Sequence, residues 1–226
     1  MTLAPATNKR TGSITMHVHG TPADPGRTLD MEGDSISVCD ATGGVVCTGS
    51  YTYAAQYAGE NNYARERSYA VSGSGLASIE GRLTGLIAAK PTTGPWVVSV
   101  LIGANDLNNT QDMTAWINRV KSYAASIRTA GGKVVLSTVL MNRAGTGTNI
   151  TTMSSQRATY NTAVRAMLTA GEIEAIADYA ADPIMGGDTS FIDYSGYWAD
   201  ATHPNALGHT RLKVIYAQAV SRAFQK

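Results

Sequence analysis

The sequence is poor in cysteine and has no long apolar run. Cys39 and Cys47 are the only cysteines among 226 residues, and no Cys/His cluster accompanies them, so zinc ligation is not expected. They lie eight residues apart, a spacing that suits a loop-closing disulfide, although two free thiols fit equally well. The longest apolar run, residues 95–102, is far too short to cross a bilayer, so we expect no membrane span.

Charged residues are also scarce. Asp, Glu, Lys and Arg make up 15% of the chain, against roughly 25% in an average globular domain. The formal net charge is +1 and no basic run occurs, which argues against nucleic acid as a partner. Residues 1–10 have no apolar core of signal-peptide length. The compartment is therefore open, and the polar composition favours an extracellular or virion-associated protein over a cytoplasmic one. The oligomeric state is open too.

The length suits one sizeable domain that buries its own core without disulfide or metal support. Residues 1–27 read as a separate lead-in, either the remnant of a preceding β-rich module or an extra strand of the main sheet. Within it, residues 13–19 alternate as in a short strand that places His17 and His19 on one face. Without a third ligand nearby, a solvated strand face is favoured over a metal site. The main domain is predicted at 28–226.

From residue 28 onward, segments with strand and helix patterns alternate. The apolar run at 96–102 is typical of a strand buried on both faces of a parallel sheet. Apolar residues at steps of three and four predict an amphipathic helix over 76–89. Strands are predicted at 28–32, 65–71, 96–102, 133–140 and 173–177, and helices at 51–57, 76–89, 114–130, 152–170 and 205–224. This order predicts a flavodoxin-like α/β/α sandwich with a mostly parallel five-stranded sheet.

Three polar motifs stand at predicted strand ends or before the last helix. Gly33-Asp34-Ser35 follows the first strand, Gly103-Ala104-Asn105-Asp106 follows the third, and residues 200–204 read Asp-Ala-Thr-His-Pro. A serine hydroxyl becomes a good nucleophile only beside a base, for which histidine is the usual choice. Each motif alone also suits an ordinary turn or helix cap. Together they favour a site at the carboxyl edge of the sheet, where ligands bind in such folds.

In order and placement these motifs resemble the blocks of the SGNH (GDSL-type) esterase/lipase family. The family's second block, a glycine after the second strand, matches Gly73, with Gly75 as the alternative. The resemblance implies that Ser35 attacks the ester carbonyl, His203 transfers the proton and Asp200 orients the histidine. It assigns the oxyanion hole to the Ser35 and Gly73 backbone N–H groups and the Asn105 amide. It implies no cofactor and no metal.

Two features depart from the family pattern. Glu32 precedes Gly33 where an apolar residue is frequent, and residues 38–62 form an insert that carries both cysteines. Neither departure removes a residue that the chemistry needs.

Aromatic residues before Asp200 are the candidates for substrate contacts. Tyr194 and Trp198, with Tyr197 between them, suit sugar rings and acyl chains alike, and packing of the terminal segment is an equal alternative. Because the chain lacks a long apolar lid, we predict an esterase that removes small acyl groups, acetyl first, from a carbohydrate. The alternatives are a lipase, arylesterase or thioesterase of the same family, or a silent carbohydrate-binding module. A nucleotide-binding protein is disfavoured, since no Gly-rich phosphate loop follows the first strand.

Overall fold

The computed structural model describes residues 26–38, 52, 53, 56, 57, 65–108, 110, 112–142 and 149–226. Its centre is one sheet of five strands in the order β2-β1-β3-β4-β5, and each neighbouring pair is parallel. The strands are β1 (Thr28–Gly33), β2 (Arg65–Ser68), β3 (Trp96–Leu101), β4 (Lys133–Ser137) and β5 (Ala175–Ala177). The direction of winding reverses between β1 and β3, as in flavodoxin-like sheets. This confirms the predicted fold class.

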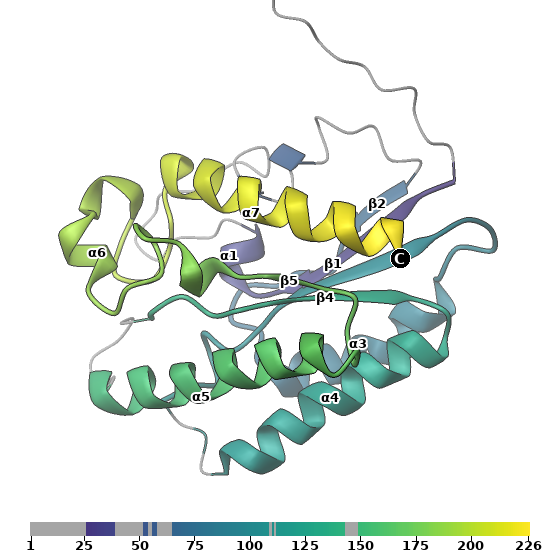
Figure 1. The fold of residues 1–226 in the computed structure, drawn as a ribbon, viewed down its shortest axis with the longest axis horizontal. Coiled ribbons are helices and arrows are strands. Elements are labelled where there is room, and N and C mark those ends of the chain that lie inside the picture. Colours follow the sequence, from purple (N-terminus) through teal and green to yellow (C-terminus); the bar gives the residue numbers. More distant parts are fainter. Residues whose placement is uncertain are drawn as a thin grey trace, which may run out of the picture.

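Helices cover both faces of the sheet (Figure 1). One layer consists of α3 (Leu76–Ala88), α4 (Met113–Thr129) and α5 (Ile150–Thr169), and the other is dominated by α7 (Ala206–Gln225), with the short α1 (Ser35–Val38) beside it. Between β5 and α7 lie three short elements, η2 (Tyr179–Ala181), α6 (Ser190–Asp193) and η3 (Ser195–Tyr197). None of the helices in these described ranges is long and apolar enough to cross a membrane.

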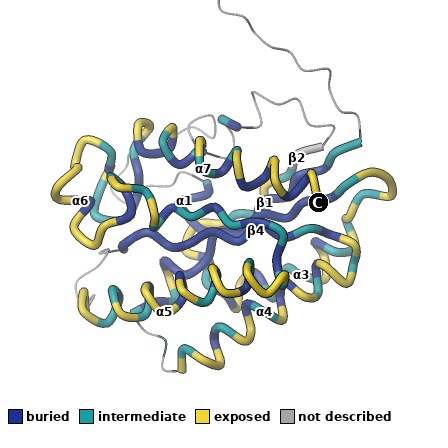
Figure 2. Tube along the Cα trace, in the orientation of Figure 1, coloured by how far each residue is buried: buried dark blue, intermediate teal, exposed yellow. Residues whose placement is uncertain are grey.

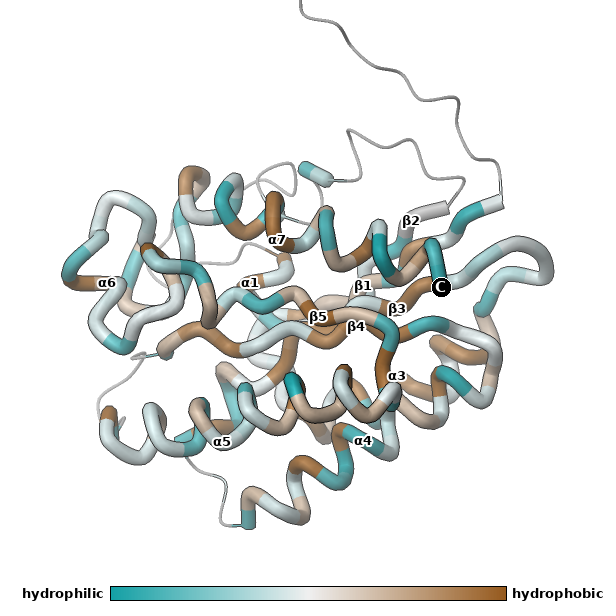
Figure 3. The backbone as a smooth tube through the Cα atoms, in the orientation of Figure 1, coloured by the Kyte–Doolittle hydropathy of each residue, from teal (hydrophilic) through white to brown (hydrophobic). Residues whose placement is uncertain are grey.

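The central strand β3 contributes to the hydrophobic core on each face of the sheet, because successive side chains point to opposite faces. Val97 and Leu101 pack on the α7 side, whereas Val98 and Val100 pack on the α3–α5 side. β1 and β3 are buried along their length, and β4 is buried after its first residue, while the helices expose their outer faces (Figure 2). Apolar residues concentrate in these central strands (Figure 3). β1 is an exception to this apolar pattern on one face only.

Toward α3–α5, β1 presents Asp30 and Glu32, which are 0% and 1% exposed. Asp30 accepts from the Trp96 indole N–H (2.7 Å) and the Arg67 Nε–H (2.6 Å), while Glu32 pairs with Arg82. Buried carboxylates are costly without such partners. The face of β1 opposite its Leu29 and Met31 side chains is therefore a polar strip inside an otherwise apolar layer.

Predicted and observed boundaries differ by a few residues, and the reasons are specific. The fourth strand ends at Ser137 rather than 140, because the Val139 N–H donates to the Asn161 side chain (2.8 Å) and not to a neighbouring strand. α5 begins at Ile150 rather than 152, because the Asn149 side chain caps it. β2 ends at Ser68, before the predicted residue 71.

Several predictions fall on residues outside the described ranges. These are the strand at 13–19 with His17 and His19, the state of Cys39 and Cys47, and most of the helix at 51–57. Of that last segment, Tyr53, Gln56 and Tyr57 are helical.

Candidate active site

Ser35 lies at the carboxyl end of β1, on the first residue of α1, and is 7% exposed. Gly33 makes this tight exit possible. A Cβ there would lie 2.3 Å from Ser37 Oγ and 3.1 Å from the Leu101 carbonyl oxygen. Asp34 shapes the turn, since its Oδ1 accepts from the Ile36 N–H (3.0 Å). The strand, the glycine and the Asx turn together fix the direction of the serine hydroxyl.

His203 approaches Ser35 from the segment that precedes α7. Its Nε2 lies 2.9 Å from Ser35 Oγ, and its Nδ1 lies 2.8 Å from Asp200 Oδ2. The other oxygen of Asp200 accepts from the N–H groups of Thr202 and His203, each at 2.7 Å. The Asp200 carboxylate thus holds both the loop and the imidazole ring of His203.

The charge of Asp200 determines which nitrogen of the His203 ring carries the proton. Burial alone would raise the pKa of Asp200, but hydrogen bonds from the His203 ring and from the loop N–H groups outweigh it, so the net pKa lies below its usual value. An ionised Asp200 accepts from His203 Nδ1–H, which leaves Nε2 as the unprotonated nitrogen that faces Ser35. The arrangement can take a proton from the serine hydroxyl.

The segment after β2 carries the predicted oxyanion glycine at the tip of a turn. The Val71 N–H donates to the Gly33 carbonyl (3.1 Å), and the Ser74 N–H closes the turn on the Val71 carbonyl (3.1 Å). Gly73 has φ +75° at the third position, as a type II turn requires. Within the described residues, its N–H and that of Ser35 have no hydrogen-bond acceptor.

Gly75, the alternative glycine, has a different environment. It precedes α3, and a Cβ there would lie 2.7 Å from Asp106 Oδ1. Asp106 Oδ1 accepts from the Leu76 N–H (3.0 Å) at the start of α3. Gly75 is therefore needed for close packing, whereas Gly73 is exposed and has no atom within 4 Å of its Cβ position.

Asn105 follows β3 and reaches the same turn. Its Nδ2 donates to the Ser74 carbonyl (3.0 Å). A carboxamide nitrogen has two N–H bonds, so this contact orients the group and leaves the second N–H for another acceptor. Because β1, β2 and β3 are adjacent and parallel, the loops with Ser35, Gly73 and Asn105 leave the same edge of the sheet.

The two aromatic residues predicted to bind substrate lie in different environments. Tyr194 is 43% exposed, between α6 and η3. Trp198 is only 6% exposed, packs in the core on the α7 side, and pairs with Pro204 across an antiparallel bridge. Trp198 thus suits packing of the terminal segment better than contact with substrate.

His209 on α7 is buried, with 1% exposure, against the Tyr53 ring (6.1 Å between centroids). Burial lowers its pKa to about 4, with a smaller effect from His203. The signal was present in the sequence, since His209, Leu212, Tyr216 and Ala219 follow helical spacing. All four lie on the buried stripe of α7. Sequence reasoning also missed the ion pair between Glu32 and Arg82.

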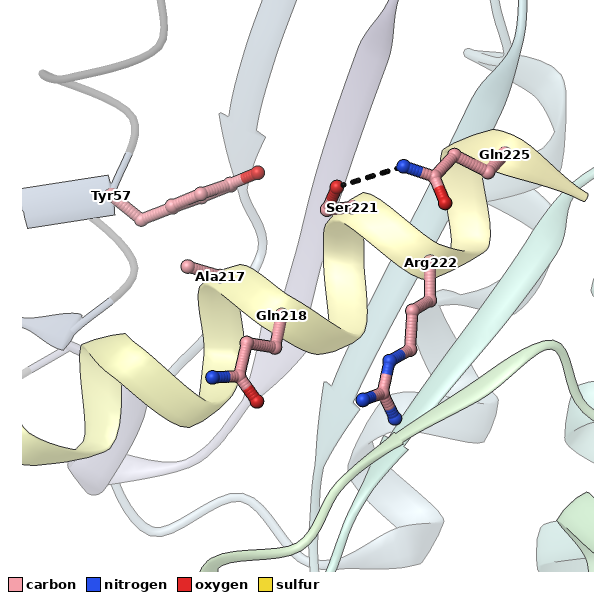
Figure 4. A pocket seen from close by; sticks show the side chains of 6 residues that line it. All are labelled: Tyr57, Ala217, Gln218, Ser221, Arg222 and Gln225. Atoms are coloured by element: carbon pink, nitrogen blue, oxygen red, sulfur yellow. Dashed lines mark hydrogen bonds between the residues drawn. The ribbon is translucent and has the colours of Figure 1, made fainter.

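A surface hollow lies elsewhere, on the outer side of α7 (Figure 4). It is lined by Tyr57, Ala217, Gln218, Ser221, Arg222 and Gln225. None of these is a predicted site residue, and the Ser221 hydroxyl accepts a hydrogen bond from Gln225 Nε2 rather than contacting a base. In the described part of the chain, no three His, Cys, Asp or Glu side chains gather as a metal site would require.

The strand order of this sheet is that of the SGNH hydrolase fold. The hydrogen-bonded serine, histidine and aspartate lie at its carboxyl edge. The chain belongs to the GDSL-like lipase/acylhydrolase family, whose sequence profile matches residues 33–211. The protein is thus a carboxylic ester hydrolase of the GDSL type. No curated protein sequence matches it.

Solved structures share this fold at low sequence identity. TesA is 20% identical with a TM-score of 0.63, over 83% of this chain and 94% of TesA. A lipolytic protein of the G-D-S-L family from Veillonella parvula is 16% identical with a TM-score of 0.66, over 87% and 99%. Axe2, an acetylxylan esterase from Geobacillus stearothermophilus, is 18% identical with a TM-score of 0.61, over 90% and 96%.

Proposed function

We propose that Ser35 is the nucleophile of this esterase, His203 its general base and acid, and Asp200 the residue that orients His203. The observation that carries the proposal is the hydrogen-bonded row from Ser35 Oγ through the His203 ring to Asp200. Ser35 and His203 are separated by 168 positions, and a helix cap or a turn does not require them to meet.

The chemistry follows from this row. Ser35 Oγ forms a bond to the acyl carbon while its proton moves to His203 Nε2. The tetrahedral intermediate then breaks its bond to the alcohol oxygen, which takes the proton from His203. Water adds to the acyl-enzyme by the same proton route, and the carboxylic acid leaves. Asp200 remains ionised and stabilises the imidazolium in both halves.

The negative oxygen of each intermediate needs donors set in place beforehand. The Ser35 and Gly73 N–H groups lack acceptors within the described residues, and Asn105 has a second amide N–H, so all three are suited to this role. Glycine suits position 73 because φ is +75° at this turn, a backbone conformation that other residues rarely adopt.

For the substrate we propose a small acyl ester, acetyl first, of a carbohydrate. The exposed Tyr194 ring offers a face to a sugar, and one structure of the same fold is named as an acetylxylan esterase. A lipase, arylesterase or thioesterase is the alternative within the same chemistry.

The mechanism is tested with Ser35→Ala and His203→Ala, assayed on an aryl acetate and with a fluorophosphonate probe. Each change is expected to lower kcat/KM at least about a thousandfold, since the row acts as a unit. Ser122→Ala, an exposed serine on α4, is the matched control and keeps wild-type activity. Full activity in Ser35→Ala would contradict the mechanism.

A series of acyl esters tests the substrate. We expect kcat/KM to be highest for acetyl and to fall with chain length, and acetylated xylooligosaccharides to be deacetylated. A rise toward long chains would favour the lipase or thioesterase alternative.

A further inference from the structure

Glu32 is a buried acid where the family pattern favours an apolar residue. It is 1% exposed and lies three residues before Ser35. Its Oε2 accepts from Arg82 Nη2 (2.7 Å), and its Oε1 lies 3.4 Å from Arg82 Nε. A buried ion pair is weak evidence for stability, because an apolar pair of similar volume often serves as well. The contacts of Arg82 beyond Glu32 indicate what this pair does.

Arg82 also reaches the turn after β2. Its Nη1 donates to Ser74 Oγ (3.2 Å), and Ser74 is 3% exposed. The Ser74 carbonyl accepts from Asn105 Nδ2 (3.0 Å), and Gly73 is the preceding residue. Ser74 is thus held through its side chain by Arg82 and holds Asn105 through its backbone. The chain of contacts runs from β1 through α3 and this turn to the loop after β3.

We propose that Glu32 and Arg82 are positioning residues for the oxyanion donors. They set Ser74, and Ser74 sets the amide of Asn105 and the turn that carries the Gly73 N–H. The inference rests on the proposed function, because it assumes that these donors bind the oxyanion.

The chemistry of arginine suits this task. A guanidinium is a planar fork whose N–H groups have fixed directions, so a carboxylate bound on one edge determines where the remaining N–H points. Glu32 is held by its backbone, since it pairs with Val100 of the neighbouring strand β3. On the other side of β1, the carbonyls of Met31 and Gly33, which flank Glu32, accept from the N–H groups of the segment after β2. The rigid sheet thereby fixes the donor that Arg82 extends to Ser74. Oxyanion donors are effective only when such placement precedes the reaction.

The test compares wild type with Glu32→Met/Arg82→Met, which replaces the ion pair by an apolar pair and leaves no unpaired buried charge. We expect the variant to fold and kcat on an aryl acetate to fall about tenfold, with KM within about twofold, because misplaced donors weaken only the transition state. Thermal unfolding monitors the fold. Arg128→Met, which breaks an ion pair with Glu174 (2.9 Å) at the opposite edge of the sheet, is the control with unchanged kcat.

A double-mutant cycle with Asn105→Ala separates positioning from general destabilisation. If the Glu32–Arg82 pair acts through Asn105, replacing the pair in the Asn105→Ala background lowers kcat by less than about threefold. The effects of coupled residues are not additive. A factor of three or more in that background would overturn the inference, as would wild-type kcat in the double methionine variant. Failure of the proposed function is distinguished by Ser35→Ala, which would then remain active whatever the ion pair does.

Discussion

Asp34 combines a turn-forming role with an unusual titration. It is 0% exposed, and its Oδ2 has no hydrogen-bond partner among the described residues. Burial raises its pKa to about 7, against the Ile36 N–H that lowers it, and the charge of Asp106 raises it further. The folded protein therefore holds a proton on Asp34 that the unfolded chain loses near its ordinary pKa of 3.8.

The raised pKa of Asp34 gives a prediction for Asp34→Asn. The stability that comes from the protonated form is present below pH 4 and is lost as pH rises to about 7. Asparagine keeps an acceptor for Ile36 and does not ionise, so the variant gains stability relative to wild type over that range, by at most about 4 kcal/mol. Urea unfolding of both proteins from pH 4 to 8 measures the difference. Parallel curves would contradict the shifted pKa.

At the scale of elements, the start of α7 fixes the loop that carries His203. Asn205 caps the helix by accepting from the Leu207 N–H (2.9 Å) and the Gly208 N–H (3.1 Å). A Cβ on Gly208 would lie 2.3 Å from the Tyr197 carbonyl oxygen and 2.8 Å from Pro204 Cβ. The helix thus presses its backbone against the segment on both sides of Asp200.

Gly208→Ala is therefore expected to destabilise the protein, although glycine to alanine usually stabilises a helix. In an open helix position, glycine to alanine stabilises by roughly 0.5–1 kcal/mol. Gly85 on α3, with nothing within 4 Å of its Cβ position, should show that gain in Gly85→Ala. Gly208→Ala should lose stability and lower kcat, because the loop with His203 must shift. Thermal unfolding and aryl acetate hydrolysis measure both. A gain in both variants would show that the close approach does not constrain α7.

Element types follow from the sequence more readily than their ends do. The apolar run of β3 and the helical stripe of α3 are local patterns, and both elements form where those patterns predict them. The end of β4 depends on Asn161, which lies on α5, 22 positions from its partner. The role of Glu32 depends on Arg82, 50 positions away. Such contacts require the packed structure, and no local pattern contains them.

At the scale of the whole molecule, parallel topology explains why the loops that carry Ser35, Gly73 and Asn105 lie at one edge of the sheet. Asp200 and His203 come from the segment before α7, and the expectation that they meet Ser35 came from the resemblance of the motifs to the family blocks. That resemblance says nothing of Trp198, which the same terminal segment turns into the core. Whether a loop residue faces solvent or core depends on the packing of α7 and η3, and no local sequence pattern contains that packing.

The pH dependence of global stability combines the contributions of two buried groups, Asp34 and His209, that change in opposite directions with pH. Burial lowers the pKa of His209 to about 4, so its contribution is present above 6.5 and is lost as pH falls toward 4. The contribution of Asp34 changes in the reverse direction over the same range. The two terms offset each other in wild type, and other groups cancel when variants are compared with it.

His209→Phe keeps an aromatic ring against Tyr53 and removes the titration. Relative to wild type it should gain stability as pH falls from 6.5 to 4, by up to about 3 kcal/mol, whereas Asp34→Asn gains as pH rises. A poor fit of the phenyl ring would add a constant offset and leave the slope unchanged. The slopes add in the double variant if the two groups titrate independently, and they depart from additivity if Tyr53, which contacts His209 and feels the charge of Asp34, couples them. Urea unfolding across this range measures all four proteins, and a His209→Phe curve parallel to wild type would mean that His209 ionises freely in the folded protein.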